Sequence, residues 1–431
     1  MKSFIEVHET SHFPIQNLPY GIFSTEENQN LRVGTAIGEY VLDLSILENK
    51  GFFKGVIATE TTVFNKTSLN DLMKLGDKAW SGIRKKLQSL LSESEPELRD
   101  DEQLRKLVFI PSSKVQLHLP VEIGDYTDFY ASKEHATNVG VMFRGKENAL
   151  MPNWTHLPVG YHGRASSVVL SGEAVRRPLG QIKPPDSAPI FEQCRQLDFE
   201  LEMGCFIGTG NDRGNPISVD EAEQHVFGMV LVNDWSARDI QAWEYQPLGP
   251  FLAKSFATSI SPWVVTMEAL EPFRTKGPDQ KPKPLQYLEQ NGKGSFDINL
   301  EVYLRSNKMS EAKKICSSNY RHLYWSIAQQ VAHHTIAGCN LNSGDLLASG
   351  TISGADKQSR GSLLELAWRG TDPIQLNEEE SREWLQDGDE LTMIGWCQGE
   401  NYRVGFGEVK AVIEPALDKD KVLKKNHLSY F

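Results

Sequence analysis

Apolar and polar positions alternate strictly along residues 296–304, and this alternation predicts a strand with one buried face. The apolar positions are Phe296, Ile298, Leu300, Val302 and Leu304, separated by Asp297, Asn299, Glu301 and Tyr303. Residues 228–232 are apolar without interruption, and residues 403–413 alternate again. Since half-buried strands are typical of antiparallel sheets, we expect antiparallel pairing to dominate this part of the chain.

Residues 1–115 show a different pattern. Short apolar runs at 32–40 and 41–46 are separated by glycine, asparagine and proline, which predicts a small module of short strands. Between Leu69 and Leu91, apolar residues recur at spacings of three, four and seven, which predicts one or two amphipathic helices. The acidic segment 92–102 then predicts a solvated connection. We therefore expect two domains, 1–118 and 119–431, the second rich in strands with a few helices.

Composition and charge restrict the possible partners. The 431 residues include 45 Lys and Arg against 57 Asp and Glu, a net charge of −12, which repels nucleic acid and anionic membrane surfaces. No stretch of 18 apolar residues occurs, and the N-terminal segment lacks the apolar core of a secretory signal. The five cysteines form no C-x-x-C pair, which favours free thiols in a reducing compartment. We expect a cytosolic protein that binds neither nucleic acid nor membrane.

Acidic residues alternate with apolar ones along residues 197–203. On a strand, Asp198, Glu200 and Glu202 would project from one face. One explanation is a solvated face, because unpaired acids normally lie in water. The other is a site for a divalent cation, because a bound cation turns the repulsion between neighbouring carboxylates into coordination.

A second polar group follows the apolar run at 228–233. Asp234 ends this run, and Arg238, Gln241 and Tyr245 would share one face with it if the following segment were a helix. Such a face would suit a binding or catalytic site at a strand end. Alternatively, Asp234 or Ser236 caps that helix, and Arg238 pairs with a nearby acid.

Three further segments are weaker candidates. Asp128 and His135 are seven residues apart and would share a helical face, although a single histidine is more often structural than catalytic. The loops 254–258 and 350–354 consist of small residues that let a ligand approach the backbone, or are plain turns. The segment 208–210 lacks the complete glycine pattern of a dinucleotide loop, so no nucleotide cofactor is expected.

Together these segments are more specific than any one alone. The sequence resembles the fumarylacetoacetate hydrolase family in Asp128-Phe129-Tyr130, His135-Ala136-Thr137-Asn138, Met142-Phe143-Arg144-Gly145, residues 156–164, Glu200/Glu202, residues 233–241 and residues 350–354. Ala253 and Ala257 stand where glycines are expected, and the tail 417–431 has no counterpart in the pattern.

The resemblance implies a mainly β (α+β) fold, with a small SH3-like β-barrel module at 1–118 and a mixed β-roll catalytic domain at 119–431. It also implies a homodimer. The implied activity is metal-dependent hydrolysis of a carbon–carbon bond in the 1,3-diketone fumarylacetoacetate, which yields fumarate and acetoacetate in the last step of tyrosine and phenylalanine catabolism.

The resemblance also implies roles for individual residues. His135 would deprotonate water, oriented by Glu365, while Arg238, Gln241 and Lys254 would stabilise the oxyanion. The implied ligands of Ca²⁺ or Mg²⁺ are Asp128, Glu200, Glu202 and Asp234, with Lys254 and Thr258 near a second, magnesium-type site at Asp234. The implied substrate-binding residues are Tyr130, Arg144, Gln241, Tyr245 and Thr351.

Two alternatives stay open. Another hydrolase or decarboxylase of the same superfamily would keep the metal carboxylates without needing His135, Gln241 and Tyr245 together. A non-catalytic metal-binding or scaffold protein would keep the fold without turnover. Loss of the diketone absorbance with and without a chelator separates these possibilities.

Overall fold

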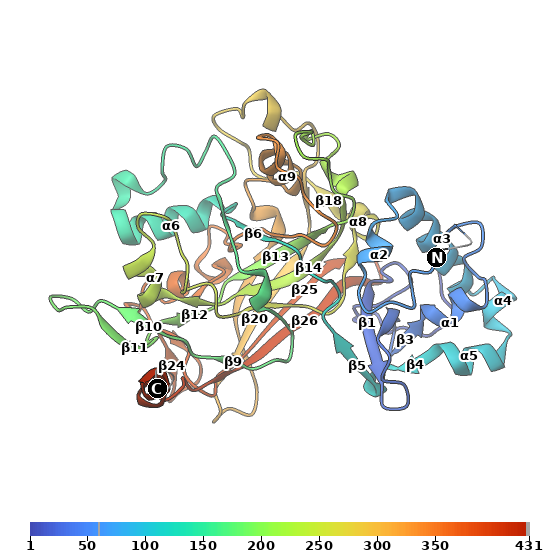
Figure 1. The fold of residues 1–431 in the computed structure, drawn as a ribbon, viewed down its shortest axis with the longest axis horizontal. Coiled ribbons are helices and arrows are strands. Elements are labelled where there is room, and N and C mark those ends of the chain that lie inside the picture. Colours follow the sequence, from blue (N-terminus) through green and yellow to red (C-terminus); the bar gives the residue numbers. More distant parts are fainter. Residues whose placement is uncertain (59–60, 428–431) are drawn as a thin grey trace.

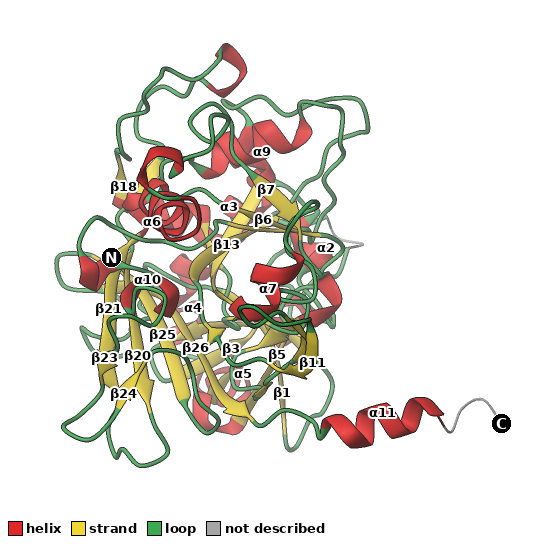
Figure 2. Ribbon diagram, turned by 90° about the vertical axis from the view of Figure 1, so that its left-hand side faces the viewer, coloured by secondary structure: helices red, strands yellow, loops and turns green. Residues whose placement is uncertain are grey.

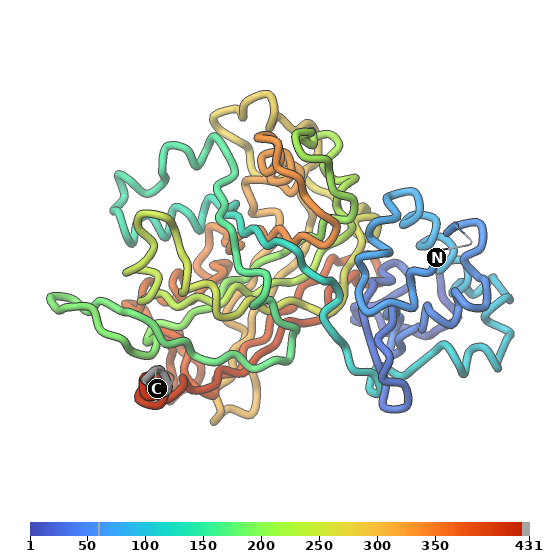
Figure 3. Tube along the Cα trace, in the orientation of Figure 1, coloured from blue at the N-terminus to red at the C-terminus, as the bar shows by residue number. Residues whose placement is uncertain are grey.

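The chain folds into a mixed α+β structure in which strands predominate, as the hydrophobic pattern predicts (Figure 1). The computed structural model describes residues 1–58 and 61–427. The N-terminal segment forms one side of the molecule and the segment after residue 120 forms the rest (Figure 3). Within the described residues, no helix is long and apolar enough to cross a bilayer.

An antiparallel five-stranded sheet with the order β4-β3-β2-β1-β5 organises the N-terminal part. Its strands are β1 (Tyr20–Thr25), β2 (Arg32–Ile37), β3 (Tyr40–Asp43), β4 (Phe109–Pro111) and β5 (Val115–His118). The helices beside it are α1 (Leu44–Asn49), α2 (Asn70–Met73), α3 (Asp77–Leu91), α4 (Pro96–Arg99) and α5 (Glu102–Val108). The amphipathic helices predicted between Leu69 and Leu91 are thus α2 and α3. The SH3-like barrel stays a prediction.

The larger part of the chain contains a central eight-stranded sheet with the order β7-β6-β22-β13-β14-β16-β8, in which β17 also pairs with β14. Its strands are β6 (Tyr126–Phe129), β7 (Gly160–His162), β8 (Val168–Leu170), β13 (Leu201–Ile207), β14 (Val226–Asp234), β16 (Thr258–Ile260), β17 (Val265–Thr266) and β22 (Leu346–Ala348). Two pairs, β6 with β22 and β8 with β16, are parallel, and the rest are antiparallel.

A second sheet has the order β21-β20-β25-β26-β9 (Figure 2). Its strands are β9 (Val175–Arg176), β20 (Asn299–Arg305), β21 (Lys313–Asn319), β25 (Glu390–Gln398) and β26 (Arg403–Glu414). Burial alternates along β20, with Leu300, Val302 and Leu304 buried, which confirms the predicted half-buried strand from residue 299 on, whereas Phe296 ends a separate short strand, β19 (Ser295–Phe296). Its pairing with β21 and β25 is antiparallel, as expected.

Short two-stranded ribbons and further helices complete the fold. The ribbons pair β10 (Leu179–Ile182) with β11 (Ile190–Gln193), β12 (Leu197–Asp198) with β15 (Ser236–Ala237), β18 (Arg274–Thr275) with β19 (Ser295–Phe296), and β23 (Ile374–Gln375) with β24 (Ser381–Arg382). The helices are α6 (Lys133–Arg144), α7 (Arg238–Glu244), α8 (Met267–Leu270), α9 (Ile327–Thr335), α10 (Leu363–Leu366) and α11 (Lys419–His427). Helix α11 extends away from the body (Figure 2), and the last four residues of the unassigned tail lie outside the described residues.

Strand β14 explains why residues 228–232 are continuously apolar. Its residues alternate between two hydrophobic cores: Met229 and Leu231 pack into the core of the larger part, whereas Val230 and Val232 pack into the core that contains the N-terminal sheet. Because both faces of β14 are buried, polar and apolar residues do not alternate along it. This arrangement makes the N-terminal part a support for the strand that ends in Asp234.

Candidate metal centre and active site

A cavity of about 400 Å³ opens between the edge of the central sheet and helices α6 and α7. Its wall carries acidic, basic and aromatic side chains together with an apolar surface that includes Val139, Phe143 and Leu364. Ten of the sequence-predicted site residues line it: Asp128, Tyr130, His135, Arg144, Glu200, Arg238, Gln241, Tyr245, Lys254 and Thr351. The other four, Glu202, Asp234, Thr258 and Glu365, do not line the cavity. A mostly apolar cavity with a few convergent polar groups is typical of a small-molecule site.

Four buried carboxylates meet beside this cavity, and two of them, Asp128 and Glu200, line it. Asp128 comes from β6, Glu202 from the start of β13, and Asp234 from the end of β14, and Glu200 directly precedes β13. One oxygen of each lies within 4.8 Å of the others, and no residue of the four is more than 5% exposed. Oxygen Oε1 of Glu202 is buried without a hydrogen-bond partner among the described residues. Burial of this kind excludes the solvated face that the sequence left open for Glu200 and Glu202.

The electrostatics of the cluster favour a bound cation. Burial and the neighbouring Asp234 carboxylate raise the pKa of Asp128 well above its usual value, and burial and Asp128 do the same for Glu202. A dication removes this repulsion and is bound with release of protons. All four ligands are oxygen donors, the set that Ca²⁺, Mg²⁺ and Mn²⁺ prefer over Zn²⁺. The residues therefore fit a divalent metal ion.

Two cationic side chains compensate part of the acidic charge. The Lys254 ammonium contacts Glu200 and donates to Asp234 Oδ2 at 2.7 Å, and Arg238 Nη1 lies 2.8 Å from Glu200 Oε1. Burial opposes ionisation of Glu200, but Lys254 and Arg238 outweigh it and hold the pKa of this carboxyl well below its usual range. Thr258 on β16 donates to Asp234 Oδ1 at 2.8 Å, so it lies where the second metal site was predicted.

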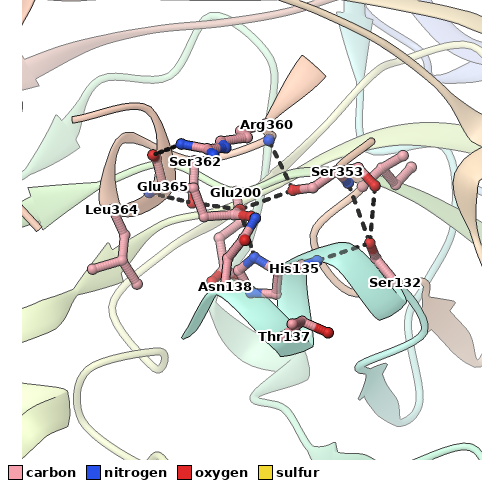
Figure 4. Close-up of polar contacts among 12 residues, drawn as sticks. Ser132, His135, Thr137, Asn138, Glu200, Ser353, Arg360, Ser362, Leu364 and Glu365 are labelled. Carbon is pink, nitrogen blue, oxygen red and sulfur yellow. Dashed lines mark hydrogen bonds and ion pairs between the residues drawn. The ribbon is translucent and has the colours of Figure 1, made fainter. Parts of the chain in front are cut away.

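A histidine–glutamate pair lies beside Glu200 of this cluster (Figure 4). Nδ1 of His135, near the start of α6, lies 2.6 Å from Oε2 of Glu365 on α10, and both side chains are buried. Burial alone would raise the pKa of Glu365, but His135 and the surrounding donors outweigh it and lower that pKa, so Glu365 is ionised at neutral pH. The ionised carboxylate accepts the Nδ1 proton, which leaves Nε2 as the basic nitrogen.

Three residues that the sequence analysis did not assign hold Glu365 in place (Figure 4). Asn138 donates to Oε1 at 2.9 Å, and the hydroxyls of Ser353 and Ser362 donate to Oε2 at 2.8 and 3.0 Å. Asn138 lies three residues after His135 on the same helix, so its spacing is a signal that the sequence contains. Ser353 belongs to the 350–354 loop. This loop is therefore more than a plain turn, because it supplies a hydrogen bond to the Glu365 carboxylate.

Helix α7 begins at Arg238, so the predicted shared helical face is correct for Arg238, Gln241 and Tyr245 but wrong for Asp234. Asp234 instead ends strand β14. Arg238 Nη1 donates to Gln241 Oε1 at 3.2 Å, and Arg238 Nη2 is buried without a partner within residues 1–58 and 61–427. A guanidinium nitrogen left free beside the cavity is suited to bind an oxygen of a ligand.

Asp128 and His135 also reach the cavity from different elements, the strand β6 and the helix α6, so their predicted common helical face is wrong. Tyr161 on β7 was missed: its hydroxyl donates to Asp234 Oδ2 at 2.9 Å and lines the same cavity. Arg144, at the last turn of α6, donates to the carbonyl oxygen of Ala149 at 2.8 Å.

Comparisons with known proteins agree over nearly the whole chain. Residues 125–414 match the family model described as fumarylacetoacetate (FAA) hydrolase C-terminal, and residues 16–120 match fumarylacetoacetase N-terminal. The chain is 57% identical to the fumarylacetoacetase of Mus musculus over 417 residues, 96% of this chain and 99% of that protein. It is 56% identical to the fumarylacetoacetase of Dictyostelium discoideum over 421 residues, 96% of this chain and 98% of that protein.

Among solved structures, a putative HpcE protein from Mycobacterium smegmatis has a TM-score of 0.53 at 20% identity, covering 92% of this chain and 99% of that one. This likeness shows a common fold.

Proposed function

This chain belongs to the fumarylacetoacetate hydrolase family, and from that membership we propose that it hydrolyses fumarylacetoacetate to fumarate and acetoacetate. The observation that carries the proposal is the placement of the His135–Glu365 pair and the four-carboxylate cluster around one cavity. The reaction is the last step of tyrosine and phenylalanine catabolism. It needs an activated water and a site that accepts negative charge on oxygen.

His135 acts as the general base. Its Nε2 takes a proton from water, and the resulting hydroxide adds to the carbonyl carbon beside the fumaryl double bond. Glu365 holds the ring through Nδ1 and stabilises the imidazolium that forms. His135 then returns the proton to the departing acetoacetate carbanion, so the proton count balances.

Arg238, Gln241 and Lys254 stabilise the tetrahedral alkoxide. Support comes from Arg238 Nη2, which has no hydrogen-bond partner in the described part of the chain, and from the position of all three side chains in the cavity wall. Preorganised donors of this kind cost no reorganisation when charge develops. Tyr130, Arg144, Tyr245 and Thr351 bind the substrate, and the guanidinium of Arg144 suits a terminal carboxylate.

Asp128, Glu200, Glu202 and Asp234 hold a divalent ion, which we propose to be Ca²⁺ or Mg²⁺. When bound, this ion would supply positive charge that stabilises negative charge developing on oxygen. A second, magnesium-type site at Asp234 with Lys254 and Thr258 is proposed from their contacts with that carboxylate.

Treatment with a chelator is expected to abolish turnover. The purified protein is mixed with fumarylacetoacetate, the loss of the diketone absorbance is followed, and fumarate and acetoacetate are quantified. After EDTA treatment, the rate should fall at least about 100-fold, because a metal that stabilises transition-state charge contributes several kcal/mol. Ca²⁺ and Mg²⁺ are then added back separately to identify the ion.

Equal formation of the two products in the untreated protein supports the proposal. Hydrolysis of acylpyruvates with no cleavage of fumarylacetoacetate would assign another activity of the superfamily, and no turnover of either substrate would indicate a non-catalytic member.

We also propose that the protein is a homodimer. Trp243, Leu248, Phe251 and Leu252, on α7 and the loop after it, are 40%, 96%, 69% and 51% exposed. These side chains are close in the sequence, and exposed apolar side chains that gather on a surface mark interaction sites. Leu248 also lines the cavity. A second copy is the partner that the family membership favours.

Phe251→Asp combined with Leu252→Asp is expected to convert the dimer to a monomer, because two buried charges at the patch cannot be paired. Light scattering measures the mass. Leu107→Asp, at an exposed residue of α5, is the control that should stay dimeric. An unchanged mass in the double variant would place the interface elsewhere.

The division into domains 1–118 and 119–431 is likewise a proposal, in which the first domain supports β14 from the core that the two parts share. A cytosolic location is also a proposal, and the five free cysteines support it.

A further inference from the structure

Asp198 is a fully buried carboxylate that takes no part in the mechanism above, yet it lies between two parts of the site. It ends strand β12, which pairs with β15 directly before Arg238. Its side chain contributes no oxygen to the four-carboxylate cluster. The sequence places Asp198 in the same alternating segment as Glu200 and Glu202, but its partners are different.

Four donors surround the Asp198 carboxylate. Oδ2 accepts from Arg238 Nε at 2.8 Å and from the backbone N–H of Leu364 at 3.1 Å. Oδ1 accepts from the backbone N–H groups of Leu363 at 2.7 Å and Phe199 at 2.8 Å. Because every partner donates, only the ionised carboxylate satisfies all of them. Burial raises the pKa of Asp198, and the Arg238 guanidinium acts against that rise.

The backbone contacts connect Asp198 with the His135–Glu365 pair. Leu363 and Leu364 are the first two residues of α10, and Glu365 is the third. Two backbone bonds to one buried carboxylate fix the turn from which Glu365 projects toward His135.

The contact with Arg238 connects Asp198 with the oxyanion site. The bond uses Nε, so Nη1 is left to reach Glu200 and Gln241, and Nη2 is left without a partner among the described residues. Asp198 therefore sets the orientation in which the guanidinium presents its free nitrogen.

We propose that Asp198 is a positioning residue that holds Arg238 and the Glu365 turn in register with each other, so that the activated water and the oxyanion donors meet at the same carbonyl. The inference rests on the proposed function for its catalytic consequence, whereas the link from Asp198 to the His135–Glu365 pair is independent of the substrate.

A matched pair elsewhere in the chain separates this role from that of an ordinary buried ion pair. Asp389, also buried, accepts from Nε and Nη2 of Arg382 at 2.9 Å each and from the backbone N–H of Gln386 at 2.8 Å. Neither Asp389 nor Arg382 lines the cavity. Asp389→Asn therefore makes the same change from carboxylate to amide in a buried ion pair that does not line the cavity.

In Asp198→Asn, the amide nitrogen replaces one oxygen and faces donors, either Arg238 Nε with the Leu364 N–H or the N–H groups of Leu363 and Phe199. In either orientation an N–H of the Glu365 turn loses its acceptor, and the charge that holds the guanidinium is gone. We expect kcat per folded molecule to fall about 100-fold, in the range found when one oxyanion donor is lost. Asp389→Asn should keep kcat within about twofold, even where thermal unfolding shows a comparable loss of stability. Equal kcat in the two variants would overturn the proposal.

A second readout needs no substrate. The proton in the short His135–Glu365 hydrogen bond is followed as a downfield proton NMR signal, assigned by its absence in His135→Gln. Asp198→Asn should shift or broaden this signal, and Asp389→Asn should leave it unchanged. An unchanged signal in folded Asp198→Asn would overturn the link to Glu365, whatever the activity of the wild-type enzyme.

If Asp198→Asn does not fold, the double variant Asp198→Asn/Arg238→Met removes the guanidinium that would be left unpaired, which is the costly part of the change. Its NMR signal is compared with that of Arg238→Met alone. A difference supports the link, and identical signals overturn it. Absence of fumarylacetoacetate cleavage in the wild type would refute the proposed function and leave this comparison valid.

Discussion

His135→Gln is expected to lower kcat by about 1,000-fold while the protein stays folded, because general base catalysis typically contributes a factor of about 10² to 10⁴. The ring is 3% exposed and contacts Glu365 at 2.6 Å through Nδ1. Glutamine is close to it in size and keeps a donor for Glu365, but its amide cannot take a proton from water at neutral pH. Steady-state rates with fumarylacetoacetate, corrected for the folded fraction, measure the effect.

The control for this prediction is His225→Gln. His225 is a partly buried histidine whose Nδ1 lies 2.7 Å from the carbonyl oxygen of Thr209, away from the cavity. Its replacement should change kcat by less than about twofold, as is usual for substitutions outside special sites. If His135→Gln retained more than a tenth of the wild-type kcat, another group would have to be the base.

Glu202→Gln is expected to remove the bound metal and to lower kcat by about 100-fold to 1,000-fold, equivalent to several kcal/mol of transition-state stabilisation. Glu202 is fully buried, and its Oε1 lacks a hydrogen-bond partner within the described chain. The amide removes a negative charge and brings a donor among carboxylates, so a cation is bound less tightly. Metal content after dialysis and calorimetric titration with Ca²⁺ and Mg²⁺ measure the loss.

Without metal, Glu202→Gln should be more stable to heat than the metal-free wild type, because burial and the Asp128 charge raise the pKa of Glu202 and make its ionised form costly. Asp345→Asn is the control for removing a buried carboxylate charge outside the cluster. Asp345 is buried and accepts from the backbone N–H groups of Asp125 and Asn342. Wild-type metal affinity in Glu202→Gln would rule out the four-carboxylate site.

Much of the fold could be predicted because burial leaves a periodic record in the sequence. The alternation at 296–304 predicts β20 and its buried face, and the spacing between Leu69 and Leu91 predicts α2 and α3. The apolar run at 228–232 predicts a buried strand, but it does not say what covers each face. Only the structure shows that the N-terminal part covers one of them.

The candidate site was predicted in part for a different reason. Chemically distinctive residues such as Asp128, His135 and Arg238 lie in short segments whose combination resembles a family, so the resemblance names them without any geometry. Local spacing is misleading where two elements meet. Asp128 and His135, and likewise Asp234 and Arg238, would share a face if each segment were helical, but each pair comes from a strand and a helix.

The sequence by itself determined the strand-rich fold class, the acidic character and the set of candidate side chains, because periodicity, charge and residue type are local properties. Tertiary structure alone decided which carboxylates meet, how Glu365 reaches His135 from 230 residues away, and that Asp198 faces Arg238 and α10. These facts depend on long-range packing, and a contact between distant segments leaves no pattern in either segment alone.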